Sequence, residues 1–117
     1  MHKLWKKTHK YNAKKVRTAD GKIFDSKKEA KRYLELKLLE RAGKIKELKT
    51  QPKFLLFETM RIENRTLRKM YYIADFEYID EQGRRVVEDV KGFRTKDYNV
   101  KIRAFREKYP DVIFKEI

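Results

Sequence analysis

Hydrophobic side chains recur at helical spacing in two stretches of the chain. The first begins after Ser26, which forms a capping box with Glu29, and it stops at Gly43, a residue type common just beyond a helix. We therefore predict a helix over 26–42. Its apolar positions are Ala30, Tyr33, Leu34, Leu38 and Leu39. The same spacing predicts a second helix over 96–109.

Apolar runs and alternating patterns predict the strands. These lie at 53–58, 70–79, 84–91 and 112–116. A short hairpin is expected over 16–24, because Asp20 followed by Gly21 favours a tight turn. Two segments are ambiguous, since 44–50 fits a loose helical turn and 59–68 fits either a loop or a strand extension. The predicted order is hairpin, helix, three strands, helix and strand.

The composition is that of one folded domain with a highly charged surface. Of the 117 residues, 40% are hydrophobic and 43% are charged, and this length suits a single core. The absence of cysteine excludes disulfides, zinc-thiolate sites and thiol catalysis. No apolar run approaches the roughly 18 residues of a membrane span, and the N-terminus lacks the apolar stretch of a secretory signal. We expect a cytoplasmic protein without membrane contact.

The formal net charge of +14 points to a polyanionic partner such as DNA. Residues 1–24 carry eight basic side chains and one acid, so half of the excess lies in this short part of the chain. We expect a core over 16–117 and a basic arm over 1–15 that contacts phosphates, although a solubilising tail is the alternative. The expected nucleic-acid contacts are Lys6, Lys7, Lys10, Lys14, Lys15, Arg17, Lys101 and Arg103.

Asp75 lies in an otherwise apolar and aromatic stretch, where an ionised carboxylate is costly unless it is paired or binds a metal. The next predicted strand ends with Glu88 and Asp89, and Lys91 follows two residues later. A three-residue turn ending at Gly83 places Asp75 opposite Asp89, whereas a four-residue turn places it opposite Glu88. We favour the three-residue turn, because it puts Gly83 in the left-handed position that such turns use. Facing carboxylates repel unless a cation lies between them, and oxygen ligands suit Mg²⁺ or Mn²⁺. The alternative is that these acids form salt bridges with the many basic residues.

This pattern resembles the PD-(D/E)xK nuclease superfamily, whose core runs helix, three strands, helix, strand. More narrowly, four segments resemble a small phage and prophage family long described as of unknown function: FDSKKEAKRYLEL, QPKF, YIADFEYI and VVEDVKGFRTKDY. The resemblance implies an α/β, restriction-endonuclease-like fold with a central mixed sheet. It implies Asp75 and Asp89 as metal ligands and Lys91 as the catalytic lysine. Glu29 matches an added catalytic and metal-binding glutamate, although a capping box also explains it, and Ala74 stands in place of the name-giving proline.

The expected function is therefore a Mg²⁺- or Mn²⁺-dependent DNA endonuclease of phage or prophage origin, in the cytoplasm of the bacterial host. The expected mechanism is in-line attack of a metal-activated water on a phosphodiester. One alternative is a structure-selective enzyme, such as a Holliday-junction resolvase, that acts as a homodimer. Another is a non-catalytic nucleic-acid-binding protein, which gives no reason for the acid and lysine set. Gln51, just before a predicted strand, is a secondary candidate for a hydrogen bond near the site.

Overall fold

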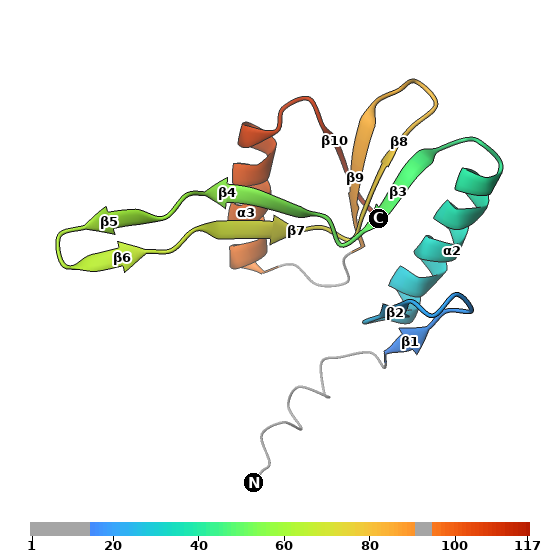
Figure 1. Cartoon of the computed structure of the whole chain (residues 1–117), viewed down its shortest axis with the longest axis horizontal. Coiled ribbons are helices and arrows are strands. Elements are labelled where there is room, and N and C mark those ends of the chain that lie inside the picture. Colours follow the sequence, from blue (N-terminus) through green and yellow to red (C-terminus); the bar gives the residue numbers. More distant parts are fainter. Residues whose placement is uncertain (1–14, 91–94) are drawn as a thin grey trace, which may run out of the picture.

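A mixed four-stranded sheet lies at the centre of the computed structural model, which describes residues 15–90 and 95–117 (Figure 1). Its strands run in the order β10 (Ile113–Glu116), β9 (Arg85–Asp89), β8 (Phe76–Ile79) and β3 (Lys46–Thr50). Strand β10 pairs with β9 in parallel, and the other two pairs are antiparallel. The predicted α/β class and the mixed central sheet are confirmed.

Helices α2 (Lys27–Arg41) and α3 (Lys96–Lys108) cover opposite faces of this sheet (Figure 1). Val86 packs in the hydrophobic cluster that contains the α2 side chains, whereas its neighbour Val87 packs in the cluster that contains those of α3. Successive side chains of a strand point to opposite faces, so the two helices must lie on the two sides of β9. The core is therefore divided by the sheet into two layers.

Both helices begin at a polar cap residue. Ser26 Oγ accepts a hydrogen bond from the Glu29 N–H at 3.1 Å, and Thr95 Oγ1 accepts one from the Tyr98 N–H at 3.0 Å. These bonds satisfy backbone donors that have no partner within the helix. Neither helix in the described ranges is long and apolar enough to cross a membrane.

Helix α2 buries a different set of side chains from the one that its sequence indicates. Its buried residues are Ala30, Tyr33 and Leu36, while Leu34 is 49% and Leu38 61% exposed. A helix that lies on a sheet buries only the strip that meets the strands, and side chains on either side of this strip stay in solvent. The strip is too narrow to cover all the apolar positions that the sequence indicates for this helix.

The first hairpin flanks the start of α2. Strands β1 (Val16–Arg17) and β2 (Ile23–Phe24) pair antiparallel, as predicted, with Gly21 in the turn at a φ of 91°. The ring centre of Phe24 lies 5.0 Å from that of Tyr33, so the hairpin closes the end of the α2 layer. Residues 1–14, which include most of the predicted basic arm, lie outside the described residues.

Strands β3 and β8 of the central sheet continue past a bend into an outer pair of strands. Backbone hydrogen bonds join the two chain segments on both sides of the bend. The outer pair consists of β4 (Lys53–Phe57) and β7 (Met70–Ile73). At the bend, Gln51 N donates to Asp75 O at 2.9 Å, and Ala74 N donates to Pro52 O at 3.0 Å. The register is the same on both sides of the bend, so β3–β4 and β7–β8 form one bent ribbon.

This bend corrects two strand predictions. The expected strand 70–79 is broken in its middle into β7 and β8, and the ambiguous segment 44–50 contains strand β3 rather than a helical turn. Strand β3 pairs with β8 in the central sheet, and the predicted strand 53–58 forms β4, which pairs with β7. The physical cause lies between β3 and β4, where Gln51 has a φ of 53° and Pro52 lacks an N–H, so a straight strand cannot continue.

Beyond the outer pair, the same ribbon ends in a hairpin that projects away from both helices (Figure 1). It is made of β5 (Met60–Ile62) and β6 (Arg65–Leu67), which pair antiparallel. Segment 59–68 is therefore a strand extension. Every residue of the two strands is exposed, so this hairpin contributes little to either core layer.

Candidate functional site

The hairpin of β8 and β9 has the predicted register. Asp80 N donates to Arg84 O at 2.9 Å, and Gly83 occupies the last position of the three-residue turn with a φ of 79°. This left-handed conformation suits glycine and selects the shorter of the two turns considered. The last pair of the ladder is Phe76 with Glu88. One step further, the register brings the two acids predicted as metal ligands to the same level.

Asp75 lies just before β8, with its carboxylate against the end of β9. Its Oδ2 accepts a hydrogen bond from the Val90 N–H at 2.6 Å, and its own N–H donates to Glu88 O at 3.1 Å. The side chain is partly buried. These two contacts hold the Asp75 carboxylate next to the backbone of Asp89, at the end of the hairpin opposite the turn.

Asp89 is the more buried of the two acids, with 2% of its surface exposed. The Tyr72 hydroxyl donates a hydrogen bond to its Oδ2. Burial raises the pKa of Tyr72 strongly, and the hydrogen bond to Asp89 and the negative charges of Asp89 and Asp75 raise it further. Tyr72 is therefore a protonated donor at neutral pH. Asp75 and Asp89 together make up the candidate site, because the hairpin register brings them to the same level.

A hollow opens beside this site where α3 begins. Its lining residues are Tyr71, Tyr72, Ile73, Thr95, Asp97, Tyr98 and Lys101. Lys101, predicted to contact nucleic acid, therefore lines the same hollow as Tyr72, and its Nζ lies 4.0 Å from Asp97 Oδ2. The hollow combines aromatic rings with a lysine and an exposed aspartate, and Tyr72 links it to Asp89.

Glu88, the alternative partner of Asp75, lies on the opposite face of the sheet. It is fully buried, and Arg32 binds both of its oxygens, with Nε to Oε1 at 2.8 Å and Nη2 to Oε2 at 2.7 Å. The Tyr78 hydroxyl also donates to it. This bidentate pair raises the pKa of Arg32, so the guanidinium stays charged. Glu88 is thus held in an ion pair under α2, and Asp89 is the acid beside Asp75.

The described structure does not bring two of the predicted catalytic residues, Glu29 and Lys91, together with the acid pair. Glu29 lies in the first turn of α2, half-buried, and its N–H is bound by the cap residue. Within residues 15–90 and 95–117, no three acidic or histidine side chains form a group that could hold a metal ion. Lys91 lies outside the described residues.

The predicted nucleic-acid contacts that the structure describes, Lys15, Arg17, Lys101 and Arg103, come from different elements. Lys6, Lys7, Lys10 and Lys14 lie outside the described residues. Lys15 forms an ion pair with Asp25 at 2.9 Å, and Arg17 is exposed on β1. Arg103 lies 3.5 Å from Glu107 on the same face of α3. The charge of these described residues is therefore partly balanced by nearby acids.

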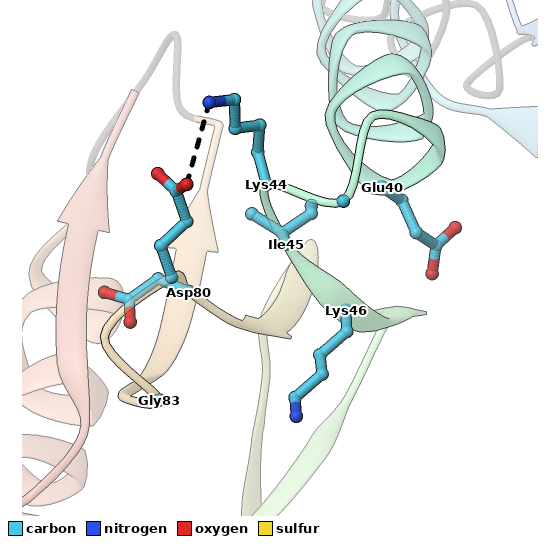
Figure 2. A pocket seen from close by; sticks show the side chains of 8 residues that line it. Glu40, Lys44, Ile45, Lys46, Asp80 and Gly83 are labelled. Carbon is cyan, nitrogen blue, oxygen red and sulfur yellow. Dashed lines mark ion pairs between the residues drawn. The ribbon is translucent and has the colours of Figure 1, made fainter.

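A further hollow lies at the other end of the central hairpin and contains none of the predicted site residues. Figure 2 shows its walls, which come from the end of α2, the start of β3 and the β8–β9 turn, with Glu40, Lys44 and Asp80 among them. The ion pair drawn there joins Lys44 Nζ and Glu81 Oε2 at 3.7 Å. Its side chains are mostly exposed and balance one another, so it is a surface depression between elements.

Sequence reasoning missed two residues that shape the site. The sequence indicates Tyr72 only as part of an aromatic strand, and it gives no signal for Arg32. Their roles depend on which strand or helix lies across from them, and no local pattern encodes that. A weak signal exists for Tyr72, because it is three residues before Asp75 in a strand whose buried positions are otherwise apolar.

The model of one protein family, described as "Protein of unknown function (DUF1064)", matches residues 8–117. The chain belongs to the DUF1064 family. No curated protein and no solved structure matches it. The expectation of a family of unknown function agrees with this membership, and the activity of this DUF1064 protein has to be argued from its own residues.

Proposed function

We propose that this DUF1064 protein is a metal-dependent DNA endonuclease with a PD-(D/E)xK, restriction-endonuclease-like core. The observation that carries the proposal is the pair of Asp75 and Asp89 at the end of the central hairpin. The register brings these two acids to the same level of the ladder, one of them is almost fully buried, and carboxylates at facing positions of a ladder repel each other. A site that binds a divalent cation has a physical reason for this arrangement.

The chemistry of this donor pair suits Mg²⁺ or Mn²⁺. Both ions prefer oxygen ligands, and Mg²⁺ is commonly held by one or two carboxylates while substrate phosphate and water complete its shell. Asp75 and Asp89 would hold the ion, and Glu29 and Lys91 are the further residues that the resemblance assigns to the site. When bound, the ion would activate water and stabilise negative charge on a phosphate.

The protein's own residues have three tasks in this proposal. Tyr72 fixes the orientation of Asp89 by its hydrogen bond, and the Val90 N–H fixes Asp75. Lys91 follows the second acid by two residues and would stabilise charge on the attacked phosphate. The positive net charge of +14 would hold the DNA backbone.

A second candidate is a nucleic-acid-binding protein without catalysis. The absence of a three-ligand group among the described residues favours it. It leaves the facing carboxylates without a role, and for that reason we place the nuclease first.

A plasmid-cleavage assay tests the nuclease proposal. Supercoiled DNA is incubated with the protein and Mg²⁺ or Mn²⁺, and nicked and linear products are measured. The wild type is compared with Asp89→Asn, which keeps a hydrogen-bond acceptor for Tyr72 but removes the charge. The control is Asp111→Asn, a loss of the same charge at an exposed position outside the helices and strands.

We expect metal-dependent cleavage by the wild type and by Asp111→Asn, and a loss of at least about 100-fold for Asp89→Asn while DNA binding persists. Cleavage by Asp89→Asn at the wild-type rate would refute the site. Binding of every DNA by the wild type without any cleavage would favour the binding protein.

A further inference from the structure

The projecting hairpin carries a second hollow with a strongly basic rim. Its lining residues are Thr59, Thr66, Arg68, Lys69 and Tyr71. Arg61 adjoins it, because Arg61 Nη1 donates to Thr66 Oγ1 at 2.7 Å. Lys53 lies over the ring of Tyr71, with Nζ 4.3 Å from the ring centre. Four cations thus surround two hydroxyls and one aromatic ring.

None of these four cations forms an ion pair with another residue of the described part of the chain, and no acidic side chain there lines the hollow. Arg32, Arg84 and Arg85 of the body each contact a carboxylate, on Glu88, Asp80 and Glu77 respectively. Other cations of the body, such as Arg41 and Lys46, have no ion pair within the described residues either. The four cations of the ribbon are distinguished by their position around one hollow that no described acid lines.

The two faces of the hairpin also differ in character. The register places Arg61 and Thr66 on one face, and it places Met60, Ile62 and Leu67 together with Arg65 on the other. The first face is polar, and the second is mostly apolar. The basic hollow includes the Thr66 side. Since phosphate oxygens accept hydrogen bonds from arginine, lysine and threonine alike, this polar face matches a sugar-phosphate backbone better than it matches a protein surface.

Strand β7 connects this hollow with the candidate acids. Tyr71 lines both the hollow on the hairpin and the one beside Tyr72, so the two surfaces are continuous. Seven residues separate Arg68 from Asp75, and extended chain rises about 3.3 Å per residue, so the distance is at most about 23 Å. One strand of duplex DNA rises about 3.4 Å per nucleotide, so this span corresponds to about six or seven base pairs.

We propose that the β4–β7 ribbon and its β5–β6 hairpin form a DNA-binding arm, whose Arg68, Lys69, Arg61 and Lys53 hold the phosphate backbone several base pairs from the acid pair. The proposal rests on DNA as the substrate of the proposed nuclease. It adds that affinity for DNA is supplied by a folded arm distant from the acids.

The test is fluorescence anisotropy with a labelled 24-base-pair DNA duplex in EDTA, so that no cleavage occurs. The variant is Arg68→Gln with Lys69→Gln, two residues that lie outside the strands, so the ladder is left intact. The control is Arg41→Gln with Lys46→Gln, which removes the same charge from two exposed positions, at the end of α2 and at the start of β3. The hairpin of β5 and β6 lies on the other side of the molecule from these two elements (Figure 1). Affinity is measured at several salt concentrations, and circular dichroism monitors the fold.

We expect the arm variant to bind at least about tenfold more weakly at 0.1 M salt, with a salt slope less steep by about 1.8, the value for two lost phosphate contacts. The control variant should keep the wild-type slope, and the charge-conserving change of Arg68→Lys with Lys69→Arg should restore affinity. Equal losses in the arm and control variants, or no loss in either, would overturn the arm while leaving the nuclease proposal intact.

Three other outcomes would overturn the proposal in different ways. Failure of the wild type to bind DNA would remove both the arm and the nuclease. Tighter binding of duplex RNA than of duplex DNA would assign the arm to RNA. An unchanged DNA affinity together with a lower oligomeric mass of the arm variant in light scattering would assign this surface to a second copy of the chain.

Discussion

The buried ion pair of Arg32 and Glu88, next to Asp89 in the sequence, allows a direct test of how much one buried charge pair contributes to stability. Glu88 lies in the middle of the sheet with 0% exposure, one residue before Asp89, and Arg32 reaches it from α2. The change Arg32→Ala removes the guanidinium and leaves a carboxylate with no charged partner under the helix. An uncompensated buried charge is among the most costly defects in a protein interior.

We expect Arg32→Ala to reduce the free energy of unfolding by about 3–5 kcal/mol, the range for loss of one partner of a buried pair. A domain of this length has a total stability of about 5–15 kcal/mol, so this is a large fraction of it. The melting temperature should fall by about 10 °C or more. Urea unfolding followed by circular dichroism measures the free energy of unfolding, and a thermal scan with the same signal measures the melting temperature. The slope of the unfolding free energy against urea shows whether the transition remains two-state.

Two further variants check the reasoning. Arg84→Ala breaks an exposed pair with Asp80 and should cost at most about 1 kcal/mol. Adding Glu88→Gln to Arg32→Ala removes the stranded charge and keeps an acceptor for the Tyr78 hydroxyl, so part of the lost stability should return. A loss below about 1 kcal/mol in Arg32→Ala, or a further loss in the double variant, would show that the buried charge is not the cause.

Two other predictions concern Gly83 in the β8–β9 turn and Tyr33 on α2. Gly83→Ala should destabilise the protein by about 1–2 kcal/mol, because φ is 79° there, whereas Gln82→Ala in the same turn should have little effect in the same urea assay. The pKa of Tyr33 is raised from 10.0 to about 12, by burial and then by its hydrogen bond to Asp20. The folded state therefore holds the Tyr33 proton more tightly, so the stability from Tyr33 is present below pH 10 and is lost as pH rises through 12. Between pH 9 and pH 11.5, the free energy of unfolding should fall less for Tyr33→Phe than for the wild type.

Local patterns predicted most of the elements because their signals lie within a few residues. The cap at Ser26, the cap at Thr95 and the three-residue turn at Gly83 all form as expected. Each depends on backbone donors or dihedral angles that only a few residue types satisfy. The same holds for the β1–β2 hairpin and its glycine turn.

The strand predictions failed where neighbours in space decide the outcome. An aromatic run such as 70–79 carries a strong β signal along its whole length, yet it is broken where the facing chain bends at Pro52. Segment 44–50 has a weak pattern of its own and becomes a strand because β8 offers a ladder to pair with. Strand formation depends on the partner strand, which lies far away in the sequence.

The amino-acid sequence by itself determined the α/β class, the helix starts, the hairpin register and the positions of Asp75 and Asp89 in the chain. Tertiary structure alone decided that Glu88 is bound by Arg32, that Tyr72 holds Asp89, and that the unpaired cations of the ribbon lie together. The physical reason is the separation in sequence between the residues that interact. Caps and turns are set by local dihedral angles and hydrogen bonds, whereas a buried charge finds its partner only when a helix and a sheet from distant parts of the chain pack against each other.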